Sequence, residues 1–267
     1  MYLLGTALGF LVFLGGDGVK LIRSSADLLG LAILVISAGL MMPFPFGDSD
    51  RPAWPLNNPS WSLSFELIAN VAYGYWLWRL GKTFLSALAI VGLACLGWTI
   101  FTFGSIETGY TLATLPGGLA RIAFSFPLGL LIARLHDEGL LAAIPTVHPF
   151  IPVAALIGML ACPLFLDRWI IEILALSIML PLVLILGIRS RDLLSWRDAS
   201  SALGGISYPL YILHAPIFVA FKTFGPTLPA HGVEAFATAG AASLLAVAVA
   251  ALATRVNSRF LLLRSRT

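Results

Sequence analysis

Four ionisable side chains lie inside long apolar stretches of the 267-residue sequence: Glu66, Arg121, Glu172 and His214. A carboxylate or an imidazole can accept and return a proton, and a guanidinium can bind an anion or polarise a carbonyl group. If the stretches span a membrane, each of these groups is costly to place there and is a candidate for function by default. The residues around each group decide which chemistry is favoured.

Glu66 belongs to a regular polar stripe. Asn58 followed by Pro59 is typical of a helix start, with an N-cap and then proline in the first turn. Ser62, Glu66 and Asn70 follow at intervals of four residues, which places them on one face of that helix. Such a face must meet protein or a water-filled cavity rather than lipid. The stripe is either a hydrogen-bonded seam between helices or a functional site, and the cost of a carboxylate favours function.

His214 is the only histidine inside an apolar stretch, because His136, His148 and His231 fall in connecting segments. Ser207, Tyr211 and His214 are spaced by four and three residues and share one helix face. Two interpretations remain open. His214 is either a hydrogen-bonded structural group beside tyrosine or a general base.

Arg121 and Glu172 each allow a structural and a functional interpretation. Arg121 can extend its charge to the membrane surface, pair with Glu66, or contact an anion or a carbonyl group in a site. Glu172 lies four residues after Arg168. An ion pair across one helical turn explains it adequately.

Composition identifies the kind of element that must position these residues. Hydrophobic residues make up 59% and charged residues 11%, against roughly 45–50% and 25% in soluble globular proteins. These values exclude a soluble fold of this size and a disordered chain, and unbroken apolar stretches argue against a β-barrel. We therefore expect an all-α fold, a polytopic bundle of transmembrane helices. Cys95 and Cys162 lie in apolar stretches and predict neither a disulfide nor a metal site.

The apolar stretches predict eight or nine membrane spans, because the first one is short. The candidates are Tyr2–Gly16, Leu28–Phe46, Trp61–Leu80, Phe84–Phe103, Leu112–Leu135, Phe150–Leu166, Trp169–Ile188, Leu203–Phe221 and Ala235–Ala253. With nine spans, the 16 lysines and arginines divide into 12 on one side, 3 on the other (Arg51, Arg168 and Lys222) and Arg121 within a span. This asymmetry predicts a cytoplasmic C-terminus and an outward-facing loop Gly47–Ser60. The net charge of +3 therefore reflects topology rather than nucleic-acid binding. Gly5 and Gly9 form a GxxxG motif, a weak signal for close helix packing.

Three segments together resemble motifs of one protein family. They are Asn58-Pro59-Ser60-Trp61-Ser62-Leu63-Ser64-Phe65-Glu66, Arg121-Ile122-Ala123-Phe124-Ser125-Phe126 with Gly129, and Ile206-Ser207-Tyr208-Pro209-Leu210-Tyr211-Ile212-Leu213-His214. Their order and spacing resemble the acyltransferase 3 family of bacterial membrane O-acyltransferases over nearly the whole chain. The resemblance implies one integral-membrane domain over residues 1–267 in the inner membrane. It also implies transfer of an acyl group, commonly acetyl, from acyl-CoA as a donor substrate to a carbohydrate hydroxyl, without a bound cofactor.

The resemblance also implies roles for residues. Glu66, Ser62 and His214 are the predicted catalytic residues, and the predicted substrate-binding residues are Trp61, Asn70, Arg121, Tyr208 and Tyr211. The family's proposed catalytic histidine lies on a helix before a stretch similar to Tyr2–Gly5, and this sequence has no counterpart of that helix. The chain therefore resembles an N-terminally incomplete member whose own activity we expect to be low. A non-catalytic relative of the family and a small-molecule transporter remain alternatives.

Overall fold

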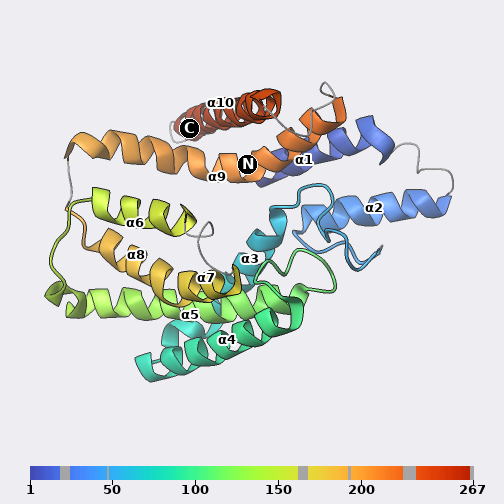
Figure 1. The fold of residues 1–267 in the computed structure, drawn as a ribbon. Coiled ribbons are helices and arrows are strands. Elements are labelled where there is room, and N and C mark those ends of the chain that lie inside the picture. The colour runs from blue at the N-terminus through green and yellow to red at the C-terminus, as the bar shows by residue number, and fades with distance from the viewer. Residues whose placement is uncertain (19–24, 47, 162–167, 192–193, 225–232, 265–267) are drawn as a thin grey trace. The chain divides into compact units, whose positions relative to one another are not determined.

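The computed structural model describes residues 1–18, 25–46, 48–161, 168–191, 194–224 and 233–264, and within them it is all-helical without a named β-strand (Figure 1). The predicted all-α class is confirmed. The helices are α1 (Tyr2–Phe13), α2 (Ser25–Gly39), α3 (Ser60–Tyr75), α4 (Lys82–Phe103), α5 (Leu115–Asp137), α6 (Phe150–Ala161), α7 (Arg168–Leu174), α8 (Leu180–Ile188), α9 (Leu194–Phe224) and α10 (Val233–Arg264).

Five stretches in the described part are long and apolar enough to cross a membrane: Lys82–Phe103, Leu115–Asp137, Ile170–Ile188, Arg197–Phe224 and Thr238–Val256. Three further apolar helices, α1, α2 and α6, are shorter. Helix α3 has 16 residues, or about 24 Å at 1.5 Å per residue, against a hydrocarbon core roughly 30 Å thick. The protein is a multi-pass membrane protein by these helices, but the predicted count of eight or nine spans is not confirmed.

The chain divides into two compact units, Met1–Leu63 with Asp198–Thr267, and Ser64–Arg197. We call them unit 1 and unit 2. Helix α3 begins in unit 1 and continues in unit 2. The predicted single domain over residues 1–267 stays a prediction.

In unit 1, α1 runs alongside α9 in the same direction, since Gly5 lies against Ile212 and Gly15 lies against Phe224 (Figure 1). Leu213 and Ile217 of α9 form a core with Ala246 and Ala253 of α10, and Leu8 of α1 packs against this core. In a series of nine successive spans, the first and the eighth must run in opposite directions. Nine complete crossings are therefore incompatible with the observed directions of α1 and α9.

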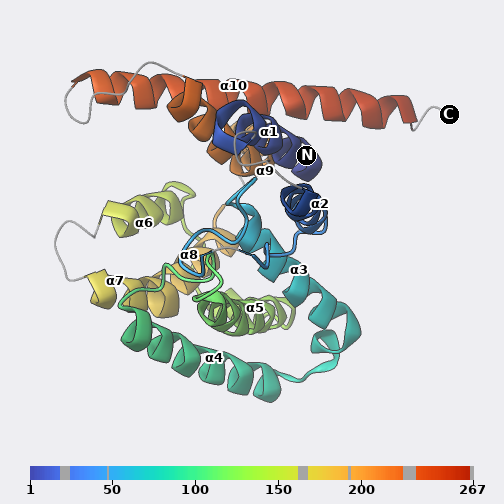
Figure 2. The same ribbon diagram turned by 90° about the vertical axis from the view of Figure 1, so that its right-hand side faces the viewer.

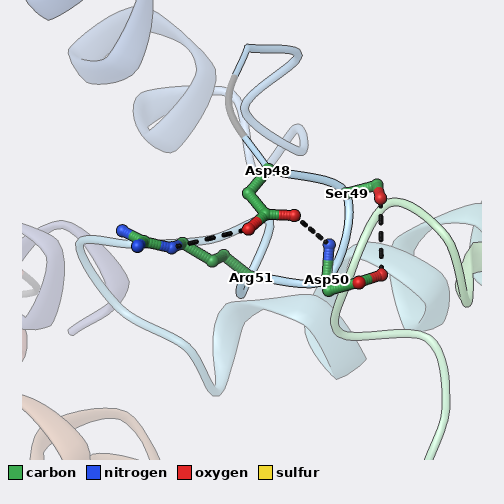
Figure 3. Close-up of polar contacts among 4 residues, drawn as sticks. All are labelled: Asp48, Ser49, Asp50 and Arg51. Carbon is green, nitrogen blue, oxygen red and sulfur yellow. Dashed lines mark hydrogen bonds and ion pairs between the residues drawn. The ribbon is translucent and has the colours of Figure 1, made fainter.

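The connection from α2 to α3 contains an exposed turn at Asp48–Arg51, shown in Figure 3. One carboxylate oxygen of Asp48 accepts a hydrogen bond from the Asp50 amide at 3.1 Å, and the other lies 3.9 Å from the Arg51 guanidinium. Ser49 donates to the Asp50 carboxylate at 3.3 Å. These three contacts join residues within the turn itself, and none of them involves a helix.

In unit 2, α4 and α5 lie side by side in both views (Figures 1 and 2). Gly92 of α4 allows this approach, because a Cβ there would overlap the backbone of Ala123 and Phe124. Leu96, Ala120 and Phe124 form the core between the two helices. Phe65 of α3 packs on Gly118, so the same unit also holds the middle of α3.

Candidate functional site

Two prolines inside α9 create attachment points in the middle of that helix. Pro209 and Pro216 have no N–H, so the carbonyl groups four residues earlier, those of Gly205 and Ile212, lose their helical donors. The structure supplies substitutes for both. The Asn57 side-chain amide donates to the Ile212 carbonyl at 3.1 Å. The Thr254 hydroxyl shares its one proton between the Ala250 carbonyl of its own helix at 2.8 Å and the Gly205 carbonyl at 3.2 Å. At each proline, a side chain from a distant part of unit 1 is thus hydrogen-bonded to α9.

Asn57 lies at a junction of three segments. Its side chain is buried, with 3% exposure. A Cβ on Gly5 would overlap Ile212 and the Asn57 amide, and one on Gly9 would overlap the Leu56 carbonyl oxygen. The GxxxG motif is therefore a real packing signal, but its partner is the chain entering α3 as well as a helix. This packing fixes the start of α3 beside the middle of α9.

Ser62 and Tyr211 meet directly at this start. Their hydroxyl groups are hydrogen-bonded to each other, and each also lies 3.2 Å from the Pro59 carbonyl oxygen. Each hydroxyl group has one proton to donate, and its acceptors here are the other hydroxyl and the Pro59 carbonyl. When both protons are used in these contacts, neither is left for an acceptor outside them. The structure brings Ser62 and Tyr211 together at the start of α3, and the predicted catalytic role of Ser62 and substrate-binding role of Tyr211 stay predictions.

His214 lies one turn after Tyr211, with the two ring centres 5.9 Å apart. Its Nδ1 is 2.8 Å from the Tyr211 carbonyl oxygen and 3.2 Å from that of Leu210. Both neighbours can only accept, so we assign the proton of the neutral ring to Nδ1. Nε2 then carries the free lone pair, which is the form that a general base requires.

Two other predicted substrate-binding residues flank this group. Trp61 precedes Ser62 on α3 and is half-buried, and Tyr208 lies one turn before Tyr211 on α9 and is exposed. Unit 1 thus gathers five of the eight predicted site residues: Trp61, Ser62, Tyr208, Tyr211 and His214.

Glu66 and Asn70 continue the stripe into unit 2, where both side chains are exposed. Their neighbours Phe65 and Ala69 are the buried members of this part of α3. The stripe therefore divides into an attached first residue, Ser62, and two exposed ones. The interior position of Glu66 and Asn70 stays a prediction.

Arg121 and Glu172 hold the loop between α4 and α5. The Glu172 carboxylate accepts hydrogen bonds from the Ser105 hydroxyl and the Ile106 amide, both at 3.0 Å. Arg121 donates to the Ile106 carbonyl at 3.4 Å, so one peptide segment is bound from both sides. Sequence reasoning considered Arg168 for Glu172, and that side chain lies outside the described residues. Sequence reasoning did not find that Arg121 and Glu172 both bind the backbone of the loop at residues 105–106.

Sequence reasoning also missed the role of Asn57, although the signal was present. A proline inside a helix marks an acceptor that needs a donor, and a buried asparagine before the next helix is one such donor. The pattern does not say which donor meets which carbonyl.

A family model described as an acyltransferase domain matches residues 2–255, nearly the whole chain. No curated protein and no solved structure matches the chain. All eight predicted site residues lie inside the matched range.

Proposed function

This chain belongs to the acyltransferase 3 family, and from that premise we propose that it transfers an acyl group, acetyl in the simplest case, from acyl-CoA to a hydroxyl of a cell-surface carbohydrate. The family match over residues 2–255 carries the proposal. The membrane-spanning helices support it, because a bilayer protein can meet a cytoplasmic thioester and an external glycan. We place the protein in the bacterial inner membrane, with the C-terminus in the cytoplasm.

The reaction sets two chemical requirements. The acceptor oxygen attacks the thioester carbonyl carbon, the carbon–sulfur bond breaks, and CoA leaves as a thiolate that gains a proton. A base must take the proton of the acceptor hydroxyl, and donors or positive charge must stabilise the oxyanion that forms.

The described residues suggest a division of this work. His214 offers Nε2 as a base, because its Nδ1 proton is held by the Tyr211 carbonyl. Glu66 is an exposed carboxylate that can hold a sugar hydroxyl or orient a base. Arg121 donates to the Ile106 carbonyl, and its guanidinium carries a positive charge of the kind that stabilises an oxyanion. Trp61, Asn70 and Tyr208 complete the proposed substrate-binding set.

The test is transfer of radiolabelled acetyl from acetyl-CoA to envelope polysaccharide in membrane vesicles that contain the full chain. We expect a low rate of labelling, as the sequence predicts, and label that mild base releases, as it does an ester. Glu66→Gln should lower the rate about a hundredfold at unchanged abundance, within the usual range for an acid–base group. Gly74→Ala, on the same helix at a position where an added Cβ meets nothing within 4 Å, controls for a general effect of altering α3.

A matched pair of variants isolates His214. His214→Asn keeps an N–H near the position of Nδ1 and removes Nε2, whereas His214→Gln keeps a polar group near Nε2. Loss of transfer in His214→Asn with normal folding supports the base role. Folded, abundant wild-type protein that transfers no label to polysaccharide would overturn the proposed function and favour a non-catalytic member of the family.

A further inference from the structure

A small cavity in unit 1 lies where α1 and α2 meet the chain that enters α3. Its volume is about 10 Å³. Tyr2 and Thr6 line it from α1, Ser37 lines it from α2, and Asn57 and Ser60 line it at the entry of α3. A cavity needs roughly 10–15 Å³ to hold one water molecule. The space therefore matches a single water and is too small for an organic ligand.

Two polar atoms in the wall of this cavity are buried and have no hydrogen-bond partner among the described residues. They are the Thr6 hydroxyl oxygen and the Asn57 side-chain oxygen, Oδ1. Thr6 is 8% exposed and Asn57 is 3% exposed. A buried polar group without a partner is costly, and most buried polar atoms in proteins have one. The two atoms thus point to a small polar ligand between them.

The orientation of the Asn57 amide is set by α9. Its nitrogen donates to the Ile212 carbonyl at 3.1 Å, and a flipped amide would place two acceptor oxygens against each other. Oδ1 can only accept, so it needs a donor. Thr6 does not donate to its own helix, whereas the buried Thr99 donates to the Cys95 carbonyl four residues earlier, at 2.9 Å. The ligand must therefore donate to Asn57 and bond a hydroxyl group.

The rest of the wall favours water over an ion. None of the described residues that line the cavity carries a charge, and an unmatched charge is costly to bury. Two other polar side chains of the wall already have partners. The Tyr2 hydroxyl donates to the Ala38 carbonyl, and the Trp54 indole donates to the Met41 carbonyl at 3.2 Å. Buried waters typically make 2–4 hydrogen bonds, about the number that this wall still offers.

We propose that this cavity holds one ordered water molecule, which donates a hydrogen bond to Asn57 Oδ1 and is also bonded to the Thr6 hydroxyl. Asn57 then joins α9 directly through its nitrogen and α1 through its oxygen and the water. One amide thereby positions the start of α3 against two helices. The proposal adds a binding site for water at this junction and does not depend on acyl transfer.

The direct test is an experimental structure of the full chain in lipid nanodiscs, at a resolution that shows ordered water. We expect one density peak within about 2.6–3.2 Å of both Thr6 Oγ1 and Asn57 Oδ1. Well-ordered side chains with no density between them would overturn the proposal.

The second test uses Thr6→Val, which keeps nearly the same shape and removes the hydroxyl. If a water is bound, it loses a partner, and we expect the unfolding equilibrium constant in detergent to rise about tenfold. If no water is bound, the same substitution removes an unpaired buried hydroxyl, and the constant should fall. An unchanged or lower constant contradicts the proposal. Thr99→Val is the matched control and should change the constant much less, because the Cys95 carbonyl keeps its helical N–H.

The third test separates water from a monovalent cation. Unfolding of the wild type and of Thr6→Val is compared in sodium chloride and in choline chloride at equal ionic strength. A water site predicts the same midpoint in both salts for each protein. Stabilisation of the wild type by sodium that Thr6→Val abolishes would refute the water and assign a cation to the cavity instead.

Discussion

The first turn of α3 and the turns that follow it carry the same kind of polar residue at the same spacing, yet they are held in different ways. Ser62 is bound to Tyr211 and Pro59, whereas Glu66 and Asn70 are exposed. A four-residue repeat in the sequence therefore shows which residues share a helix face, but not which of them share a partner. The hydrogen bonds that attach this face of α3 to its neighbours lie at the start of the helix, and the Glu66 carboxylate lies one turn further on.

The largest expected effect comes from breaking the attached end. Gly9→Ala should destabilise the protein by more than about 3 kcal/mol, beyond the usual 1–3 kcal/mol of overpacking, because the obstructing atom belongs to the Leu56 backbone. Thermal unfolding in detergent measures this. Gly30→Ala on α2 is the matched control, since a Cβ there meets nothing within 4 Å and alanine should stabilise the helix. Equal effects of the two substitutions would contradict the junction.

Asn57→Ala should cost about 1–3 kcal/mol, because the Ile212 carbonyl loses its donor in a buried position. Pro216→Ala restores a helical N–H to that same carbonyl. It should therefore stabilise the Asn57→Ala protein more than the wild type, by roughly 1 kcal/mol in a double-mutant cycle. Pro209→Ala serves Gly205 instead, and should show no such coupling with Asn57→Ala. Coupling of equal size for both prolines would refute the assignment of donors.

The hydroxyl pair should show a smaller coupling that sharpens the comparison within α3. Ser62→Ala and Tyr211→Phe each remove one member of a shared hydrogen bond, so their combined effect on unfolding free energy should fall short of additivity by about 0.5–1.5 kcal/mol. Asn70→Ala combined with Tyr211→Phe provides the control and should be additive. Chemical denaturation in mixed micelles is a suitable measurement, and additive effects of Ser62→Ala and Tyr211→Phe would be the contrary result.

The smallest effect is expected at the exposed end of the stripe. Asn70→Ala should change stability by less than about 0.5 kcal/mol, because the side chain is exposed and has no hydrogen-bond partner among the described residues. A loss comparable to that of Asn57→Ala, measured under the same unfolding conditions, would show that this part of α3 is also attached.

Composition and spacing were enough to predict the all-α membrane fold and the shared face of Tyr211 and His214. The family came from the resemblance of three segments to its motifs. The partners of buried polar groups were harder to predict. Glu172 lies one turn after an arginine, but its carboxylate binds the Ser105 hydroxyl and the Ile106 amide, and every residue except proline offers such an amide. A pattern of side chains contains no information about which backbone group will be within reach.

The predicted span count is not confirmed, for a related reason. Hydropathy measures how apolar a stretch is, but not where it begins relative to its neighbours. Trp61–Leu80 is apolar over a span's length, yet α3 ends at Tyr75 and begins beside the middle of α9, where Asn57 is bound to Ile212. The direction of α1 also depends on tertiary packing, at Gly5 and Gly15, and no local signal encodes it.

The two prolines of α9 have a consequence for how the protein is made. Asn57 has already been synthesised when α9 leaves the ribosome, so the Ile212 carbonyl can be covered at once. The Gly205 carbonyl must wait for Thr254, which follows it by 49 residues. At about 5–20 residues per second, that interval lasts roughly 2–10 s. During this time the Gly205 carbonyl of α9 lacks the Thr254 hydroxyl, and a chain that stops before Thr254 never gains it.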